Sequence, residues 1–172
     1  LSKLKGVYDK LLRQNKSGNV QGIAQVHQDI AEQNPAGAFL CGYPVFREIC
    51  RLQVRKTARF DENEYILLLT LKAGEYTGSK VSDVNLFRIR NAMPHLVETL
   101  KKSLRPGDAV AQFSDSQYVI LLSACTYEGG MLVANRIISK FYQDNKIYRN
   151  LKIKINIEKV KTTENILSKY TG

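Results

Sequence analysis

The stretch RPGDAVAQFSDSQYVILLS, residues 105–123, is the most informative part of this sequence. Its first four residues, Arg105 to Asp108, combine proline and glycine in a way that is typical of a turn. Two apolar runs follow, residues 109–113 and 117–123, and three short polar residues separate them. Because two such runs joined by a tight polar turn are typical of antiparallel strands, the stretch predicts a β-hairpin.

The segment before the hairpin predicts a strand and a long helix. Residues 64–71, EYILLLTL, form a short continuous apolar run, which is typical of a strand covered on both faces. Residues 83–104 place apolar side chains at helical spacing. Ser82 or Asp83 can cap this helix, and Pro94 should kink it.

The segment after the hairpin predicts a second helix and a last strand. Residues 128–143 again have helical spacing, and residues 151–160 alternate apolar and polar side chains like a half-exposed strand. From residue 64 the order is therefore βαββαβ, the split βαβ arrangement of ferredoxin-like sheets. The predicted fold class is α/β, of the α+β kind.

The N-terminal part predicts helices and a boundary. Apolar residues recur at helical intervals over residues 1–14 and 19–33, and Asn34-Pro35-Ala36-Gly37 breaks the second helix. We therefore expect a helical linker or dimerisation segment at residues 1–36 and one domain at residues 37–172. The opening residues, which lack an initial Met, suggest a piece excised from a longer protein.

The composition is that of an ordinary globular domain. Of the 172 residues, 44% are hydrophobic and 24% are charged, which excludes disordered and collagen-like classes. No apolar run reaches the roughly 20 residues that span a bilayer, and no secretory signal is visible. We expect a cytoplasmic domain without membrane contact. The cysteines lack metal-binding spacing and are expected to be buried: Cys41, Cys50 and Cys125.

The formal net charge of +10 invites a nucleic-acid hypothesis. The basic residues cluster only in part, on one predicted helix and at the end of the chain: Arg47, Arg51, Arg55, Lys56, Arg59, Lys152, Lys154, Lys159 and Lys161. Aromatic residues do not interleave with them as in single-strand binders. We favour a solvated basic face, and direct nucleic-acid binding stays open as an alternative.

Residues 105–123 resemble the signature hairpin of the GGDEF family of diguanylate cyclases, and the resemblance covers about residues 37–160. Ser114, Asp115, Ser116, Gln117 and Tyr118 occupy the signature turn. The resemblance implies a nucleotide-cyclase-type palm with N-terminal helices. The whole chain is also similar, more weakly, to the C-terminal part of bacterial transcriptional activators that carry a BTAD/SARP-type architecture.

The resemblance also implies that this domain is not an enzyme. Cyclisation needs a divalent metal held by carboxylates at the end of the central strand and in the signature turn. Those places carry Thr70 and Ser116, and Gln117 replaces the following acid. We therefore expect a degenerate GGDEF domain that has no catalytic residue, no bound metal and no cofactor.

One motif of the family is retained. An Arg-x-x-Asp motif five residues before the signature turn forms an inhibitory site for cyclic di-GMP in the family, and Arg105 and Asp108 match it. An Arg fork can bind a guanine edge, and a carboxylate can accept from the base. The alternative is structural: a β-turn at Pro106-Gly107, with Arg105 closing the helix and Asp108 binding turn amides. Candidates for a second basic contact are Arg88, Arg90, Lys101 and Lys102.

These observations leave two main functions open. One is a non-catalytic regulatory domain of a bacterial transcriptional regulator, which senses cyclic di-GMP or another guanine nucleotide and binds DNA only through domains absent from this chain. The other is a protein-interaction or dimerisation module without a ligand. In both cases we expect a homodimer.

Overall fold

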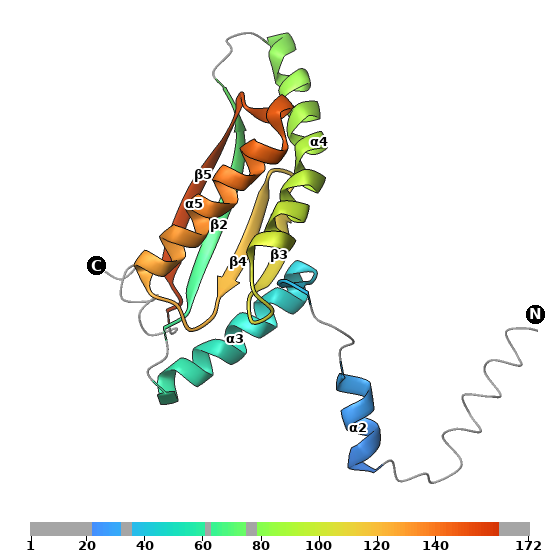
Figure 1. The fold of residues 1–172 in the computed structure, drawn as a ribbon, viewed down its shortest axis with the longest axis vertical. Coiled ribbons are helices and arrows are strands. Elements are labelled where there is room, and N and C mark those ends of the chain that lie inside the picture. Colours follow the sequence, from blue (N-terminus) through green and yellow to red (C-terminus); the bar gives the residue numbers. More distant parts are fainter. Residues whose placement is uncertain (1–21, 32–35, 61–62, 75–78, 162–172) are drawn as a thin grey trace, which may run out of the picture. The chain divides into compact units, whose positions relative to one another are not determined.

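The computed structural model of the chain describes residues 22–31, 36–60, 63–74 and 79–161 (Figure 1). Contacts divide the chain into two units, Leu1–Asn34 and Pro35–Gly172. In the first unit the structure describes one helix, α2, at Ile23–Ile30. It lies inside the helix predicted over residues 19–33. The helix predicted over residues 1–14 lies outside the described residues.

The second unit is built on a five-stranded sheet with the order β1-β3-β4-β2-β5. The strands are β1 (Phe39–Leu40), β2 (Tyr65–Ala73), β3 (Ala109–Ser114), β4 (Gln117–Leu122) and β5 (Leu151–Lys159). β2 pairs antiparallel with β4 and β5, and β3 forms an antiparallel hairpin with β4. The predicted ferredoxin-like order is confirmed. The strand β1, which pairs in parallel with β3 at the edge of the sheet, was not predicted from the sequence.

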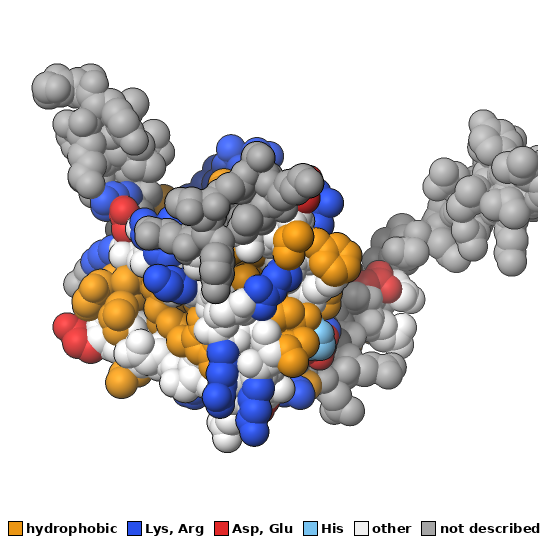
Figure 2. Space-filling model, turned by 90° about the horizontal axis from the view of Figure 1, so that it is seen from above, with side chains coloured by type: hydrophobic (Ala, Val, Ile, Leu, Met, Phe, Trp, Pro, Cys, Tyr) orange, Lys and Arg blue, Asp and Glu red, His pale blue; other side chains and the backbone are white. Residues whose placement is uncertain are grey.

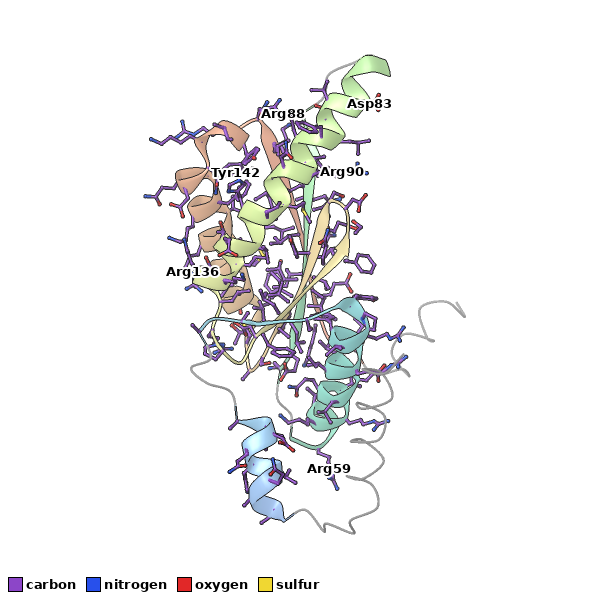
Figure 3. The ribbon with its side chains drawn as sticks, turned by 90° about the vertical axis from the view of Figure 1, so that its right-hand side faces the viewer. Arg59, Asp83, Arg88, Arg90, Arg136 and Tyr142 are labelled. Carbon is purple, nitrogen blue, oxygen red and sulfur yellow. The ribbon has the colours of Figure 1, made fainter. Side chains whose placement is uncertain are left out.

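Helices cover the sheet on two sides (Figure 3). α4 (Ser79–Ser103) and α5 (Tyr127–Asp144) pack on one face, and the short helix η1 (Lys146–Tyr148) follows α5. The main core lies under them and includes Leu67, Leu69, Leu96, Ile120, Ile137 and Phe141. α3 (Tyr43–Phe60) packs on the other face, where Phe46 lies over alanine and valine side chains of β3 and β4.

Three expectations need correction. The central strand is fully covered only on the side of α4 and α5, because α3 reaches only part of the other face and leaves Ile66 and Leu68 half-buried. α4 begins at Ser79, so neither Ser82 nor Asp83 lies at its start. The three cysteines are half-buried rather than buried.

Within the described residues, no helix is long and apolar enough to cross a bilayer.

Candidate functional site

The Arg105–Asp108 turn connects α4 to β3, and Asp108 organises it. The amide of Asp108 donates to the carbonyl of Arg105 (3.0 Å). The Asp108 carboxylate accepts from the Arg105 amide (3.1 Å), from Arg105 Nε (3.4 Å) and from the Ser123 amide (3.4 Å). With only 3% of the residue exposed, this carboxylate is largely committed to the turn. These hydrogen bonds are the ones expected if the motif serves as a structural turn, the alternative to ligand binding.

The Arg105 side chain, in contrast, stays accessible. It is 57% exposed. Its Nη2 donates to the carbonyls of Ser123 and Ala124, in the segment that leads from β4 to α5. Since the guanidinium has five N–H donors, these contacts leave part of its hydrogen-bonding capacity for a ligand.

A pocket of about 790 Å³ lies between this turn, the end of α4 and the start of α5. Its basic lining residues are Lys102, Arg105 and Arg136, and its one acidic lining residue is Asp108. Thr126 caps α5 by accepting from the Gly129 amide (3.0 Å), and both residues line the pocket. Basic side chains and the positive end of a helix dipole together favour an anionic ligand.

Arg136 is the residue of this pocket that the sequence analysis missed. It lies on α5, beside α4 (Figure 3), and its Nη2 donates to the Ser103 carbonyl at the end of α4 (2.6 Å). Of the four residues expected to supply a second basic contact, Lys102 lines the pocket. Arg88 binds Asn150, Arg90 binds Asp115, and Lys101 binds Glu98. In the sequence, Arg136 follows Gly129 and Val133 at helical intervals, which places the three residues on one side of α5. That this side faces Arg105 follows only from the packing of α5 against α4.

Two other lining residues bear on the chemistry of the pocket. Ser103 is buried, and its hydroxyl has no hydrogen-bond partner among the described residues. Burial raises the pKa of the Cys125 thiol, and the nearby Arg105 lowers it by less. The thiol therefore stays protonated at neutral pH, and the pocket offers donors for a ligand rather than a thiolate nucleophile.

The second candidate region is the turn of the β3–β4 hairpin, where the resemblance to diguanylate cyclases implies a metal site. Thr70 lies opposite Gln117, and Gln117 Nε2 donates to Thr70 Oγ1 (3.0 Å). Ser114 Oγ donates to Gln117 Oε1 (3.0 Å), and the carbonyl of Ser116 accepts from the Leu71 amide (2.8 Å). Thr70 and the turn thus lie together, as the resemblance implied. The groups that meet there are hydroxyls and an amide, and not the carboxylates of a metal site.

The remaining signature residues point elsewhere. Asp115 forms an ion pair with Arg90 of α4 (3.4 Å), and its side chain is 79% exposed. Tyr118 is buried and its hydroxyl donates to the Met93 carbonyl (3.4 Å). Among the residues that the structure describes, no three His, Cys, Asp or Glu side chains gather in a way that could hold a metal ion.

Comparison with known proteins identifies the fold. No protein-family model and no curated protein matches the chain. Solved structures do match. A DGC protein of Thermotoga maritima aligns with 78% of this chain and 95% of its own length, at a TM-score of 0.56 and 14% identity. The GGDEF domain of FimX from Pseudomonas aeruginosa aligns over 81% and 88%, at a TM-score of 0.56 and 15% identity.

A longer protein aligns with nearly the whole chain. The diguanylate cyclase SiaD of Pseudomonas aeruginosa, solved in complex with its activator SiaC, covers 97% of this chain over 62% of its own length. The TM-score is 0.53 and the identity is 10%. The strand order, the hairpin and these structural neighbours together show that this chain has the fold of GGDEF domains.

Proposed function

We propose that this chain is a non-catalytic regulatory domain that senses cyclic di-GMP, or a related guanine nucleotide, through the pocket between Arg105 and Arg136. The observation that carries the proposal is that one pocket brings together two arginines and the N-terminus of α5 beside the retained Arg-x-x-Asp turn. The protein that contains the domain is, on this proposal, a bacterial transcriptional regulator that contacts DNA through other domains.

The hairpin turn supports the non-catalytic part of the proposal. Mg²⁺ prefers negatively charged oxygen ligands, and catalysis by metal requires that the ion be held at the reacting phosphates. Thr70 and Ser116 offer neutral hydroxyl groups, and the Thr70 hydroxyl already accepts from Gln117. A domain with this turn can keep the fold of a cyclase and still lack the negatively charged carboxylates that would hold Mg²⁺.

The pocket supports the ligand class. A guanidinium can donate two parallel hydrogen bonds to O6 and N7 of guanine, and phosphate oxygens are favoured at a helix N-terminus. Arg105 and Arg136 both line the pocket, Arg105 from the turn and Arg136 from α5. In this proposal Asp108 mainly orients Arg105, because the Asp108 carboxylate is buried and accepts a hydrogen bond from Arg105 Nε.

Calorimetric titration of cyclic di-GMP and GTP into the full chain tests the proposal. We expect Arg105→Ala and Arg136→Ala each to weaken cyclic di-GMP binding roughly tenfold or more, since a bidentate contact to a base contributes about 1–3 kcal/mol. Arg88→Ala is the matched control, because Arg88 binds Asn150 and does not line the pocket.

Two results would contradict the proposal. Binding that is equally tight in all three variants would place the ligand elsewhere. Absence of binding to both nucleotides would leave the protein-interaction or dimerisation module, with the Arg-x-x-Asp turn serving the fold alone.

A further inference from the structure

Three lysines lie together on the sheet face that α3 leaves partly open. They are Lys72 on β2 and Lys152 and Lys154 on β5, and all three are exposed. The alternate residues of these strands, such as Leu71 and Ile153, face the core under α4 and α5. Because side chains alternate along a strand, the three lysines point to the opposite side. We call this group the lysine face.

The register of the sheet places these lysines side by side. Lys72 is directly opposite Lys152, and Thr70 is directly opposite Lys154. Directly opposed side chains in an antiparallel pair have Cβ atoms about 5 Å apart, and diagonal ones about 7 Å. Like charges directly opposite each other destabilise a sheet. Repulsion within the Lys72–Lys152 pair therefore destabilises the sheet, and neither charge is required for the fold.

No acidic side chain offsets this cost within the described residues. Glu158 lies farther along β5 and forms an ion pair with Lys161. Asp115 forms an ion pair with Arg90, on the side of α4. None of the salt bridges among the described residues includes a member of the lysine face. The chain as a whole has a net charge of +10, and the face drawn in Figure 2 carries more basic than acidic side chains. An anion bound at the lysine face would relieve the repulsion.

The same face continues with polar and aromatic side chains. Beside Lys154 lie Thr70 of β2 and then Gln117 of β4, joined by a hydrogen bond. On β3, Ser114 is opposite Gln117, and Phe113 lies next to it in the β-bulge between Gln112 and Ser114. The Phe113 ring contacts Tyr43 of α3 edge-on, with centroids 4.9 Å apart, and the residue is 48% exposed. Three strand spacings of about 4.8 Å separate β3 from β5, so the row spans about 14 Å.

The geometry points to a binding surface for single-stranded nucleic acid across this row. Phosphates would lie against the three lysines, the neutral donors of Thr70 and Gln117 would contact the backbone or a base edge, and a base would stack on Phe113. Stacking on an aromatic side chain requires an unpaired base, which favours a single strand over a duplex. The surface lies on the opposite side of the sheet from α5, so it is independent of the proposed nucleotide pocket.

Fluorescence anisotropy with labelled 12-residue oligo-dT and oligo-rU, titrated with the full chain at several NaCl concentrations, tests the inference. The variant carries Lys72→Gln, Lys152→Gln and Lys154→Gln. We expect affinity to fall at least tenfold at low salt and the slope of log K against log salt to flatten by about 2, since each phosphate contact on a single strand contributes about 0.7. Phe113→Ala should weaken binding at least fivefold without changing the slope.

A control variant removes the same number of charges from the helix-covered side: Lys140→Gln, Lys146→Gln and Arg149→Gln. We expect its affinity to stay within threefold of the parent. Equal loss in both triple variants, or no loss in the lysine-face variant, would overturn the inference. So would preferential binding of a duplex of the same length, or full competition by free triphosphate, which would make the ligand a small polyphosphate. Unchanged circular dichroism in each variant separates loss of binding from loss of fold.

Discussion

Asp108 illustrates how one residue of a ligand-binding motif can be committed to the fold. Its carboxylate is buried and accepts from three N–H groups of Arg105 and Ser123, so it joins the end of α4 to the segment after β4. Asp115 is the useful contrast, because it is an exposed aspartate that has a single ion pair with Arg90. The two carboxylates have the same charge, and their different burial accounts for their different roles.

Asp108→Ala should lower the free energy of unfolding by about 1–3 kcal/mol, because it leaves buried amide donors without an acceptor. Asp115→Ala, the matched control, should change it by less than about 1 kcal/mol, as expected for an exposed ion pair. Urea denaturation followed by circular dichroism measures both. Equal effects of the two substitutions would show that the turn does not depend on the Asp108 carboxylate.

The cysteines show the same effect of burial on chemistry. Burial raises the pKa of the Cys50 thiol to about 11, and nearby Cys41 and Glu64 add smaller contributions in the same direction. Because the thiolate is the reactive form, Cys50 is a structural residue at neutral pH and not a nucleophile.

Among the secondary-structure elements, the short strand β1 depends on a single glycine. β1 is only two residues long, and the chain enters it after Gly37, which has a φ of 75°. A Cβ at Gly37 would lie 2.1 Å from the carbonyl oxygen of Lys101, near the end of α4. The edge strand is thus attached to α4 at a point where only glycine fits.

Gly37→Ala should lower the free energy of unfolding by more than about 1 kcal/mol, because it combines a left-handed backbone with a clash against backbone atoms. Gly107→Ala is the control, since a Cβ there meets nothing within 4 Å. Thermal unfolding of both variants gives the comparison. A Gly37→Ala protein as stable as the Gly107→Ala protein would mean that β1 moves away from α4 at little cost.

The molecule as a whole has the fold of GGDEF domains, and we propose that it lacks their cyclase chemistry. The β3–β4 hairpin is present and Thr70 lies beside its turn, but the side chains that meet there carry hydroxyl and amide groups instead of carboxylates. We expect the purified chain with GTP and Mg²⁺ or Mn²⁺ to produce no cyclic dinucleotide, as measured by chromatography and mass spectrometry.

The combined Thr70→Asp and Ser116→Asp variant should also be inactive, because Gln117 and the non-glycine residues Ser114 and Asp115 still occupy the turn. An active diguanylate cyclase assayed in parallel is the control. Product from the parent chain would contradict the non-catalytic assignment, and product from the variant alone would show that the two carboxylates were the only missing parts.

Self-association is the other property of the whole chain that can be measured. α2 exposes an apolar stripe of Ile23, Val26 and Ile30. Exposed stripes of this kind favour association. Removal of residues 1–33 should lower the sedimentation-derived mass at high concentration and leave the circular dichroism of the remaining body unchanged, because both core clusters lie after residue 37. A full chain that is monomeric at high concentration would contradict the predicted homodimer.

The order of strands and helices was predictable because it rests on local patterns. The spacing of apolar residues and the turn residues of 105–108 and 114–116 act over a few neighbours, and they placed the hairpin and the βαββαβ order correctly. The short strand β1 was not predictable, because two residues carry no periodicity and the strand exists only through pairing with β3. The position of Arg136 beside Arg105, and of Lys72 opposite Lys152, follows from helix packing and sheet register. Those depend on contacts between segments far apart in the chain, so no local pattern in the sequence could reveal them.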